Sequence, residues 1–397
     1  MVNYDILFAV IFYGILLLFF IKNRNKFEVQ GGIFALYKTK RGIKLMEKFS
    51  KFFPKFLRVL GIFGVLVGVI GMIFMFYILV DGAIKIFTLP GAPPVVAPLL
   101  PGIKIPGLPT LSFWHWIISI FIVAVIHEFS HGVFSKLHKV KVKSSGFAFL
   151  GPILAAFVEP DEKQMIKKNK LAQLSIFAAG PFSNIILALL IFLIAIFLVF
   201  PASASLIQSE GVQINNLEKN YPAMNAGIKQ GDVITAVNGI KINNVEDFIN
   251  TLKEIKPNER ITLTTNESNF NMIAAANPKN NDKGYIGVAI SPVSVDIKES
   301  VINKYGNFLP KSLFWFSILL QWLFIISFGV GLFNLLPLGP IDGGRMFRTL
   351  LSYFIKDTKK LDKIFITVSL FSLLLIILNL MPFIIKLISF IFTPFKI

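Results

Sequence analysis

The sequence predicts a polytopic α-helical membrane protein with about six transmembrane helices and an inserted α+β domain. Three observations support this fold class. Hydrophobic residues make up 54% of the 397 residues and charged residues only 16%, which is typical of integral membrane proteins. The apolar residues gather in segments long enough to cross a bilayer, which takes about 20 residues in a helix. Between Pro201 and Gly306 the composition becomes polar, which indicates a soluble insertion.

Six apolar segments are the predicted membrane spans. The first has no basic residues before it and no small-residue cleavage site after it, so we interpret it as a retained helix rather than a signal peptide. The spans are residues 6–21, 59–80, 111–135, 171–200, 312–336 and 364–385.

The net charge of +18 is distributed as in a membrane protein rather than in a nucleic-acid-binding protein. Lys and Arg crowd the segments 22–58, 136–170 and 345–363, whereas the Pro-rich loop after the second span holds only Lys85 and Lys104. Because basic loops stay in the cytoplasm, this asymmetry places the N-terminus of a multi-pass cell-membrane protein on the extracytoplasmic side. The charge also indicates contact with membrane lipids, and no nucleic-acid partner is expected.

A metal-binding motif lies inside the third span. The chain contains no cysteine, so any metal must bind to His, Asp or Glu. In VIHEFSHGVF, residues 125–134, His127 and His131 share one face of a helix, where both imidazoles can bind a single Zn²⁺. Glu128 lies about 100° further round the helix, where its carboxylate can take a proton from a zinc-activated water. The pattern arises by chance in soluble proteins, but three ionisable groups within a membrane span are costly unless paired or hydrated.

The third metal ligand is expected from a later span, because catalytic zinc usually has three protein ligands and one open position. Asp342 in NLLPLGPIDGGR, residues 334–345, is the best candidate, since it follows the fifth span at a depth similar to that of His127. Pro337 and Pro340 break the helix before it, and irregular backbone at such depth is tolerated only beside protein or a water-filled cavity. For Asp342 alone, a simple role in the turn or as a helix cap is the alternative.

The insertion, residues 203–306, carries the signals of a small α+β domain. AGIKQGD and VNG mark tight turns around a β run from Val233 to Val237, and a helix is expected from Val245 to Ile255. The pattern from Ala226 to Ile234 resembles that of PDZ domains, and residues 285–291 are similar to their last strand. The resemblance implies recognition of a peptide or protein tail at a sheet edge. A domain that only blocks access to the membrane part is the alternative.

Together the motifs HEFSH and NLLPLGPIDGG resemble those of the site-2 protease family of intramembrane zinc metalloproteases. The resemblance extends to GPFSN at residues 180–184, to a segment at 147–163 where the family has a membrane re-entrant β-hairpin, and to the PDZ-like insertion. It covers residues 111–350. One departure is Gly339, which stands where some members have a second proline, but Asp342 keeps its offset of eight residues from Asn334.

Carried onto this sequence, the resemblance implies one zinc ion per chain and a glutamate as general base and acid. The residues concerned are His127, His131 and Asp342 as ligands and Glu128 as the base. Asn184 and Asn334 are implied to bind the substrate backbone or to polarise the scissile carbonyl. Hydrogen bonding between helices is the alternative for both asparagines.

These signals divide the chain into four parts. An N-terminal pair of spans with a basic cytoplasmic loop is followed by the first half of the catalytic core, the PDZ-like domain, and the second half of the core with the Asp ligand. Their bounds are residues 1–110, 111–202, 203–306 and 307–397.

The function expected is hydrolysis of peptide bonds within or near transmembrane segments of other membrane proteins. The predicted topology places the metal toward the cytoplasmic side and the PDZ-like domain outside the cytoplasm. A membrane metal-ion transporter with a midplane ion site is one alternative, although no internal repeats are visible. An inactive scaffold that uses the PDZ-like domain to hold partners is another.

Overall fold

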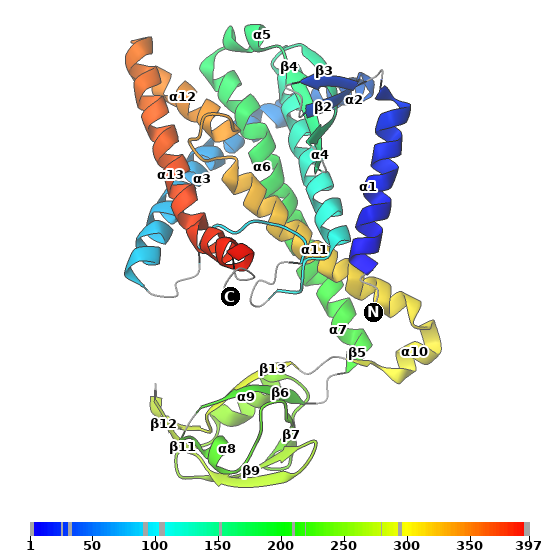
Figure 1. Cartoon of the computed structure of the whole chain (residues 1–397), viewed down its shortest axis with the longest axis vertical. Coiled ribbons are helices and arrows are strands. Elements are labelled where there is room, and N and C mark those ends of the chain that lie inside the picture. The colour runs from blue at the N-terminus through cyan, green and yellow to red at the C-terminus, as the bar shows by residue number, and fades with distance from the viewer. Residues whose placement is uncertain are drawn as a thin grey trace. The chain divides into compact units, whose positions relative to one another are not determined.

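The computed structural model describes residues 4–24, 27–30, 34–89, 94–102, 108–150, 153–208, 211–218, 220–278, 280–292 and 296–392. The chain divides into two compact units (Figure 1). We call residues 1–195 and 318–397 the helical unit, and residues 196–317 the sheet unit.

The helical unit is built from long apolar helices joined by shorter ones. Over their described residues, five helices are long and apolar enough to cross a membrane, and α1 is an apolar helix of 19 residues. The fold class predicted from the sequence is therefore confirmed. The helices are α1 (Tyr4–Lys22), α2 (Arg41–Phe52), α3 (Pro54–Thr88), α4 (Phe113–Leu137), α5 (Glu162–Ile166), α6 (Lys170–Ile194), α11 (Phe308–Phe333), α12 (Asp342–Phe354) and α13 (Thr358–Phe392).

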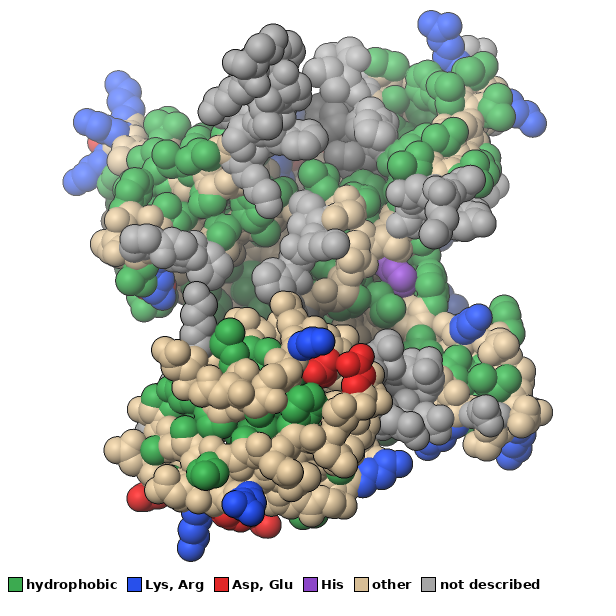
Figure 2. All heavy atoms as spheres, turned by 60° about the horizontal axis from the view of Figure 1, so that its bottom comes forward, with side chains coloured by type: hydrophobic (Ala, Val, Ile, Leu, Met, Phe, Trp, Pro, Cys, Tyr) green, Lys and Arg blue, Asp and Glu red, His purple; other side chains and the backbone are tan. Residues whose placement is uncertain are grey.

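Large apolar side chains lie exposed on these helices, as expected for surfaces that face lipid. On α3 alone, Phe63, Leu66, Ile70 and Ile73 are all more than half exposed. In the space-filling view, apolar side chains spread over the helical unit, whereas the sheet unit shows a more polar surface (Figure 2). Many of the apolar residues of the chain therefore lie on the surface of the helical unit as well as in its core.

The fourth span is longer than predicted. α6 continues without a break into a π-helical turn, Ala195–Val199, and then into α7 (Phe200–Leu206). Pro201 does not end this helix, because the widened π turn directly before it relieves the clash that a proline makes with the preceding turn.

An antiparallel sheet lies beside α4. Its strand order is β1-β2-β3-β4, with β1 (Phe27–Gln30), β2 (Phe34–Thr39), β3 (Val142–Leu150) and β4 (Ile153–Pro160). β3 and β4 form the hairpin expected near residues 147–163. The sequence did not reveal that β2 pairs with β3 along six residues, from Phe34 opposite Leu150 to Thr39 opposite Ser145. Because β2 covers β3, the strand beside α4 that keeps an open edge is β4.

α3 packs closely against the segment that follows α11. A Cβ atom on Gly68 would lie 2.6 Å from Cε of Met346, and one on Gly71 would lie 2.5 Å from Cδ1 of Leu335. Both glycines are therefore needed for close contact between helices in the membrane, where small residues let backbones approach. The N-terminal part of the chain thus supports the turn that leads to α12.

The sheet unit is an α+β domain with its own hydrophobic core. Its main sheet has the order β10-β9-β7-β6-β13, with β8 paired to β7. Buried Ile214, Ile234, Phe248 and Leu263 belong to its core. The elements are β5 (Ile207–Gln208), β6 (Val212–Leu217), α8 (Pro222–Asn225), β7 (Val233–Val237), β8 (Ile240–Lys241), α9 (Val245–Lys253), β9 (Arg260–Thr265), β10 (Asn269–Ile273), β11 (Ala275–Asn277), β12 (Asn280–Tyr285), β13 (Val288–Pro292), β14 (Asp296–Ile297) and α10 (Glu299–Tyr305).

Two predicted elements of this unit agree with the structure and one differs. β7 has the predicted bounds, and α9 begins as predicted but ends at Lys253. The single strand expected at residues 285–291 is instead the end of β12 and most of β13. Gly287 lies between them with a φ of 78°, a left-handed conformation that interrupts an extended strand.

Candidate metal centre

Helix α4 brings the two histidines together. Its first turn is capped by Ser112, whose side chain accepts a hydrogen bond from the backbone N–H of His115. His131 follows His127 by four positions on the helix, so both imidazoles project from the same face. Their Nε2 atoms lie 3.2 Å apart, and each residue is 8% exposed.

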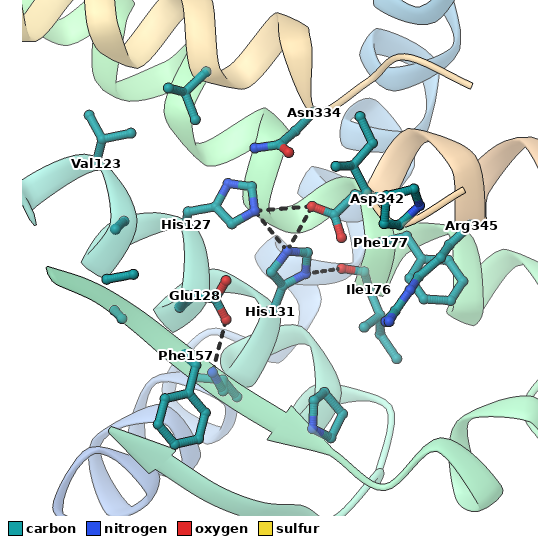
Figure 3. Close-up of a pocket in the computed structure, with 18 of the residues that line it drawn as sticks. Val123, His127, Glu128, His131, Phe157, Ile176, Phe177, Asn334, Asp342 and Arg345 are labelled. Carbon is teal, nitrogen blue, oxygen red and sulfur yellow. Dashed lines mark hydrogen bonds and ion pairs between the residues drawn. The ribbon is translucent and has the colours of Figure 1, made fainter. Parts of the chain in front are cut away.

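A tight turn brings Asp342 to the same point. The backbone N–H of Gly343 donates to the carbonyl oxygen of Asn334 at 2.7 Å and closes the segment between α11 and α12. A Cβ atom on Gly343 would lie 2.2 Å from the backbone of Leu335, so only glycine allows this closure. Asp342 then begins α12, and its Oδ2 lies 3.0 Å from Nε2 of His127 and 3.2 Å from Nε2 of His131 (Figure 3).

The three side-chain atoms have the spacing of zinc ligands. With zinc bonds of about 2.0 to 2.2 Å, tetrahedral ligand atoms lie about 3.3 Å from one another. His127, His131 and Asp342 offer three such atoms, all within 4.8 Å of one another. Nδ1 of His131 donates to the carbonyl oxygen of Ile176 at 2.7 Å, so in the neutral imidazole Nε2 carries the lone pair and can bind a metal. The residues therefore fit Zn²⁺.

Helix α6 packs directly against both imidazoles. At Gly180, an added Cβ atom would lie 2.3 Å from Nε2 of His131 and 2.5 Å from Nε2 of His127. No side chain larger than hydrogen fits at this position. Gly180 therefore lets α6 cover the metal centre on the side away from the sheet.

Glu128 faces the other side, toward β4. Its Oε2 accepts a hydrogen bond from the backbone N–H of Val158 at 2.9 Å (Figure 3). Because backbone groups alternate along a strand, the N–H of Ala156 points away from β3 in the same direction as that of Val158. The open edge of β4 is thus next to the glutamate of the motif.

A cavity of about 500 Å³ joins these features. Apolar residues such as Val123, Phe157 and Ile326 line most of its wall. The polar groups that line it include the three metal-ligand candidates, Glu128, Asn334 and Arg345. The site is therefore an apolar cavity with a few convergent polar groups, as in many binding and catalytic sites.

The two asparagines implied to bind substrate lie in different places. Asn334 lines the cavity, and its side chain extends to the region beside His127 and Asp342 (Figure 3). Asn184 is fully buried and is absent from the residues that line the cavity. Its side chain instead contacts Nδ1 of His127 at 3.1 Å, on the ring edge away from Asp342.

His138 lies at the end of α4 and outside this cluster. Its Nε2 atom is 2.7 Å from Oγ of Ser175 in α6. Burial lowers the pKa of His138, and the nearby charges of Arg58 and Lys168 lower it further. Both effects favour the neutral imidazole where α4 meets α6.

Sequence reasoning missed three groups that build the site. They are Gly180, the carbonyl oxygen of Ile176 and the N–H of Val158. GPFSN marks Gly180 as unusual, but nothing in the sequence says that two imidazoles lie against it. The other two are backbone atoms, whose partners depend on the packing of α6 and β4 against α4.

Comparison with known proteins is consistent with this geometry. Residues 115–378 match the family described as Peptidase family M50. An uncharacterized protein of Methanocaldococcus jannaschii is 31% identical over 333 residues, which is 83% of this chain and 80% of that protein. A protein of Clostridium acetobutylicum, whose given name proposes a zinc metalloprotease, is 24% identical over 68% of this chain and 96% of its own.

Solved structures of PDZ domains match part of the chain. One of them is the PDZ domain of an SdrC-like protein from Listeria monocytogenes, and the match covers 20% of this chain and 87% of that domain. The identity is 17% and the TM-score is 0.19. A likeness of this strength supports no inference about function.

Proposed function

We propose that this chain, which belongs to peptidase family M50 and is a zinc metalloprotease of the membrane, cleaves peptide bonds within or near transmembrane segments of other proteins. The observation that carries the proposal is the cluster of His127, His131 and Asp342 beside Glu128. The Nε2 atoms of the two histidines and Oδ2 of Asp342 lie 3.0 to 3.2 Å from one another. They line a cavity bordered by the open edge of β4.

His127, His131 and Asp342 are the proposed zinc ligands. When bound, Zn²⁺ supplies Lewis acidity, which makes water nucleophilic near neutral pH and polarises a carbonyl group. Two imidazoles and one carboxylate leave a tetrahedral position open, as catalytic zinc sites require. The apolar cavity wall strengthens the interactions of the few charges it encloses.

Glu128 is the proposed general base and acid. It follows His127 directly on α4 and lines the same cavity, so its carboxylate can take a proton from the attacking water. The same carboxylic acid then gives the proton to the leaving amine nitrogen as the peptide bond breaks. The hydrogen bond from Val158 holds Glu128 at the cavity wall before the reaction.

The substrate is proposed to bind as an extended strand on β4. A transmembrane helix hides its own amide groups, so the cleaved segment must unwind before a protease can reach it. The outward backbone groups of Ala156 and Val158 line the cavity and offer that segment hydrogen bonds in exchange. This arrangement places a paired peptide along the glutamate of α4.

Asn334 is proposed to hold the substrate carbonyl. Its side chain lines the cavity next to the ligand cluster, where an amide N–H can donate to an oxygen that gains negative charge. Such a donor is worth about 10² to 10³ in rate in other hydrolases.

The sheet unit and the topology complete the proposal. The PDZ-like domain recognises a peptide or protein tail, or excludes substrates that have not been shortened by an earlier cut. The basic loops at residues 22–58, 136–170 and 345–363 support an orientation with the metal toward the cytoplasm and with the N-terminus and the sheet unit outside it. Cleavage would then release a cytoplasmic fragment, and this process is called regulated intramembrane proteolysis. The basic loops would contact anionic lipids.

The proposal is tested by cleavage of single-span substrates, full-length and truncated, with the purified chain in detergent. Wild type is expected to cut within the span, and Glu128→Gln is expected to keep one zinc while losing at least about 10²-fold in rate. Asp342→Ala should lose both zinc and activity. A wild-type protein that binds zinc but cuts no substrate in the panel would overturn the proposal and favour a metal carrier or sensor.

A further inference from the structure

We infer that Asn184 is a positioning residue for the metal centre: its Oδ1 accepts the Nδ1–H of His127 and thereby directs the lone pair of Nε2 to the zinc. This role rests on the zinc site of the proposed function. It differs from substrate binding, because Asn184 does not line the cavity.

The first observation is an unpaired oxygen. Asn184 is fully buried, and its Oδ1 finds no hydrogen-bond partner within the part of the chain that the structure describes. A buried amide oxygen without a partner is destabilising, so its orphaned state calls for an explanation. Its Nδ2 lies 3.1 Å from Nδ1 of His127.

The second observation concerns the proton of His127. A neutral imidazole carries one N–H, and the other nitrogen is an acceptor. If Nδ2 of Asn184 donates to Nδ1, the proton of His127 must be on Nε2. Nε2 is the atom that faces Asp342 and His131 at 3.0 and 3.2 Å, and a protonated Nε2 cannot bind a metal.

A half-turn of the side-chain amide pairs the oxygen and places the proton of His127 on Nδ1. The oxygen and nitrogen of an amide have nearly the same shape, so their assignment follows from their partners. After the turn, Oδ1 of Asn184 accepts the Nδ1–H of His127, and the orphaned oxygen has its partner. Nε2 of His127 then carries a lone pair toward Asp342 and His131, as zinc requires.

The other histidine ligand is already held in this way. Nδ1 of His131 donates to the carbonyl oxygen of Ile176, which is also on α6. With Asn184 turned, one helix supplies an acceptor to each imidazole and fixes both tautomers. Oxygen acceptors of this kind commonly orient histidine ligands of metals.

The backbone of Asn184 is anchored by a different helix. Oγ of Ser327 in α11 donates to its carbonyl oxygen at 2.8 Å. This bond joins α11 to α6 and does not touch His127. Ser327→Ala is therefore a matched control that weakens the packing of α6 without removing the acceptor.

The test measures zinc affinity of the full chain by competition with a chelator, with no cleavage assay. Asn184→Leu keeps the approximate volume and removes the acceptor, and it should weaken zinc binding about 10- to 100-fold. Asn184→Asp restores an oxygen acceptor and should bind zinc at least as tightly as wild type. Ser327→Ala should leave the affinity within about 3-fold, well short of that loss. The melting temperature of the metal-free proteins reports folding separately.

Two outcomes would overturn the inference. One is zinc affinity of Asn184→Leu equal to that of wild type with a lower melting temperature, which would make Asn184 a packing residue only. The other is equal loss in the Leu and Asp variants. Because cleavage is not measured, a wild type that binds zinc but cuts nothing would sink the proposed function and leave this inference standing.

Discussion

The carboxylate of Glu128 lies 2.9 Å from the backbone nitrogen of Val158 and accepts its hydrogen bond. The glutamate of the metal motif is thus attached to the open edge of a sheet. An added strand that pairs with β4 would compete for the same N–H. A substrate that pairs with the N–H of Val158 would therefore free the carboxylate of Glu128, the proposed base, from that hydrogen bond.

Ala156→Pro tests whether substrates pair with β4. The N–H of Ala156 points away from β3, so proline removes a donor for an added strand and leaves the β3–β4 ladder intact. Loss of one backbone hydrogen bond, about 1 kcal/mol, should lower kcat/KM about 5-fold with unchanged zinc content. Ala155→Pro is the control, because its N–H points toward β3 and its loss should lower the melting temperature. Unaltered kcat/KM in Ala156→Pro would argue against strand pairing.

Gly180→Ala tests the close contact between α6 and the two imidazoles. The new methyl group would meet Nε2 of both histidines at 2.3 and 2.5 Å, so the rings must leave their positions. Zinc affinity should fall by at least about 100-fold, the upper range seen when supporting contacts of a metal ligand are lost. Gly329→Ala is the control, because no atom lies within 4 Å of its added carbon. Equal zinc affinity in both variants would show that α6 can shift to accommodate the added methyl group without disturbing the two imidazoles.

Asp342→Ala removes the proposed third ligand. The two remaining imidazoles cannot form a three-ligand site, so zinc affinity should fall by more than about 100-fold, beyond the range for loss of a supporting contact. Asp362→Ala is a matched control, since Asp362 is also a carboxylate near α12 but pairs with exposed Arg348 at 2.8 Å. That surface pair is worth at most about 1 kcal/mol. Zinc titration of both variants compares them, and normal zinc binding by Asp342→Ala would disprove the ligand assignment.

His138 should make the contact between α4 and α6 sensitive to acid. Its pKa in the folded protein is lowered from 6.5, so the unfolded chain takes up the proton first as the pH falls. The free energy of unfolding therefore has its full contribution from neutral His138 above pH 6.5, and this contribution is lost as the pH falls below that value. His138→Gln, which can still bond to Ser175, should lose part of this dependence. Melting temperatures between pH 5 and pH 7.5 measure it, and parallel curves for the two proteins would contradict the expectation.

The cluster of proposed metal ligands was largely predictable from the sequence, because local rules govern it. The four-residue spacing of His127 and His131 fixes their common face in any helix. Asp342 could be selected because few ionisable residues lie at membrane depth. The structure brings all three together within 4.8 Å.

Features that depend on tertiary packing could not be predicted. The pairing of β2 with β3 joins residues more than 100 positions apart, and no short pattern announces it. The family resemblance implied that Asn184 binds substrate, with hydrogen bonding between helices as the alternative. Whether a side chain on α6 points into a cavity or to the far edge of His127 depends on helix rotation, which sequence spacing does not specify.

The separation of the proposed metal ligands along the chain sets the order in which the centre forms during synthesis. His127 and Asp342 are 215 positions apart, and the whole sheet unit is encoded between them. At about 5 to 20 residues per second, a ribosome makes Asp342 roughly 10 to 40 s after His127. The nascent chain therefore enters the membrane with an incomplete set of ligands. Zinc loading, and with it proteolysis, has to wait until translation is almost finished.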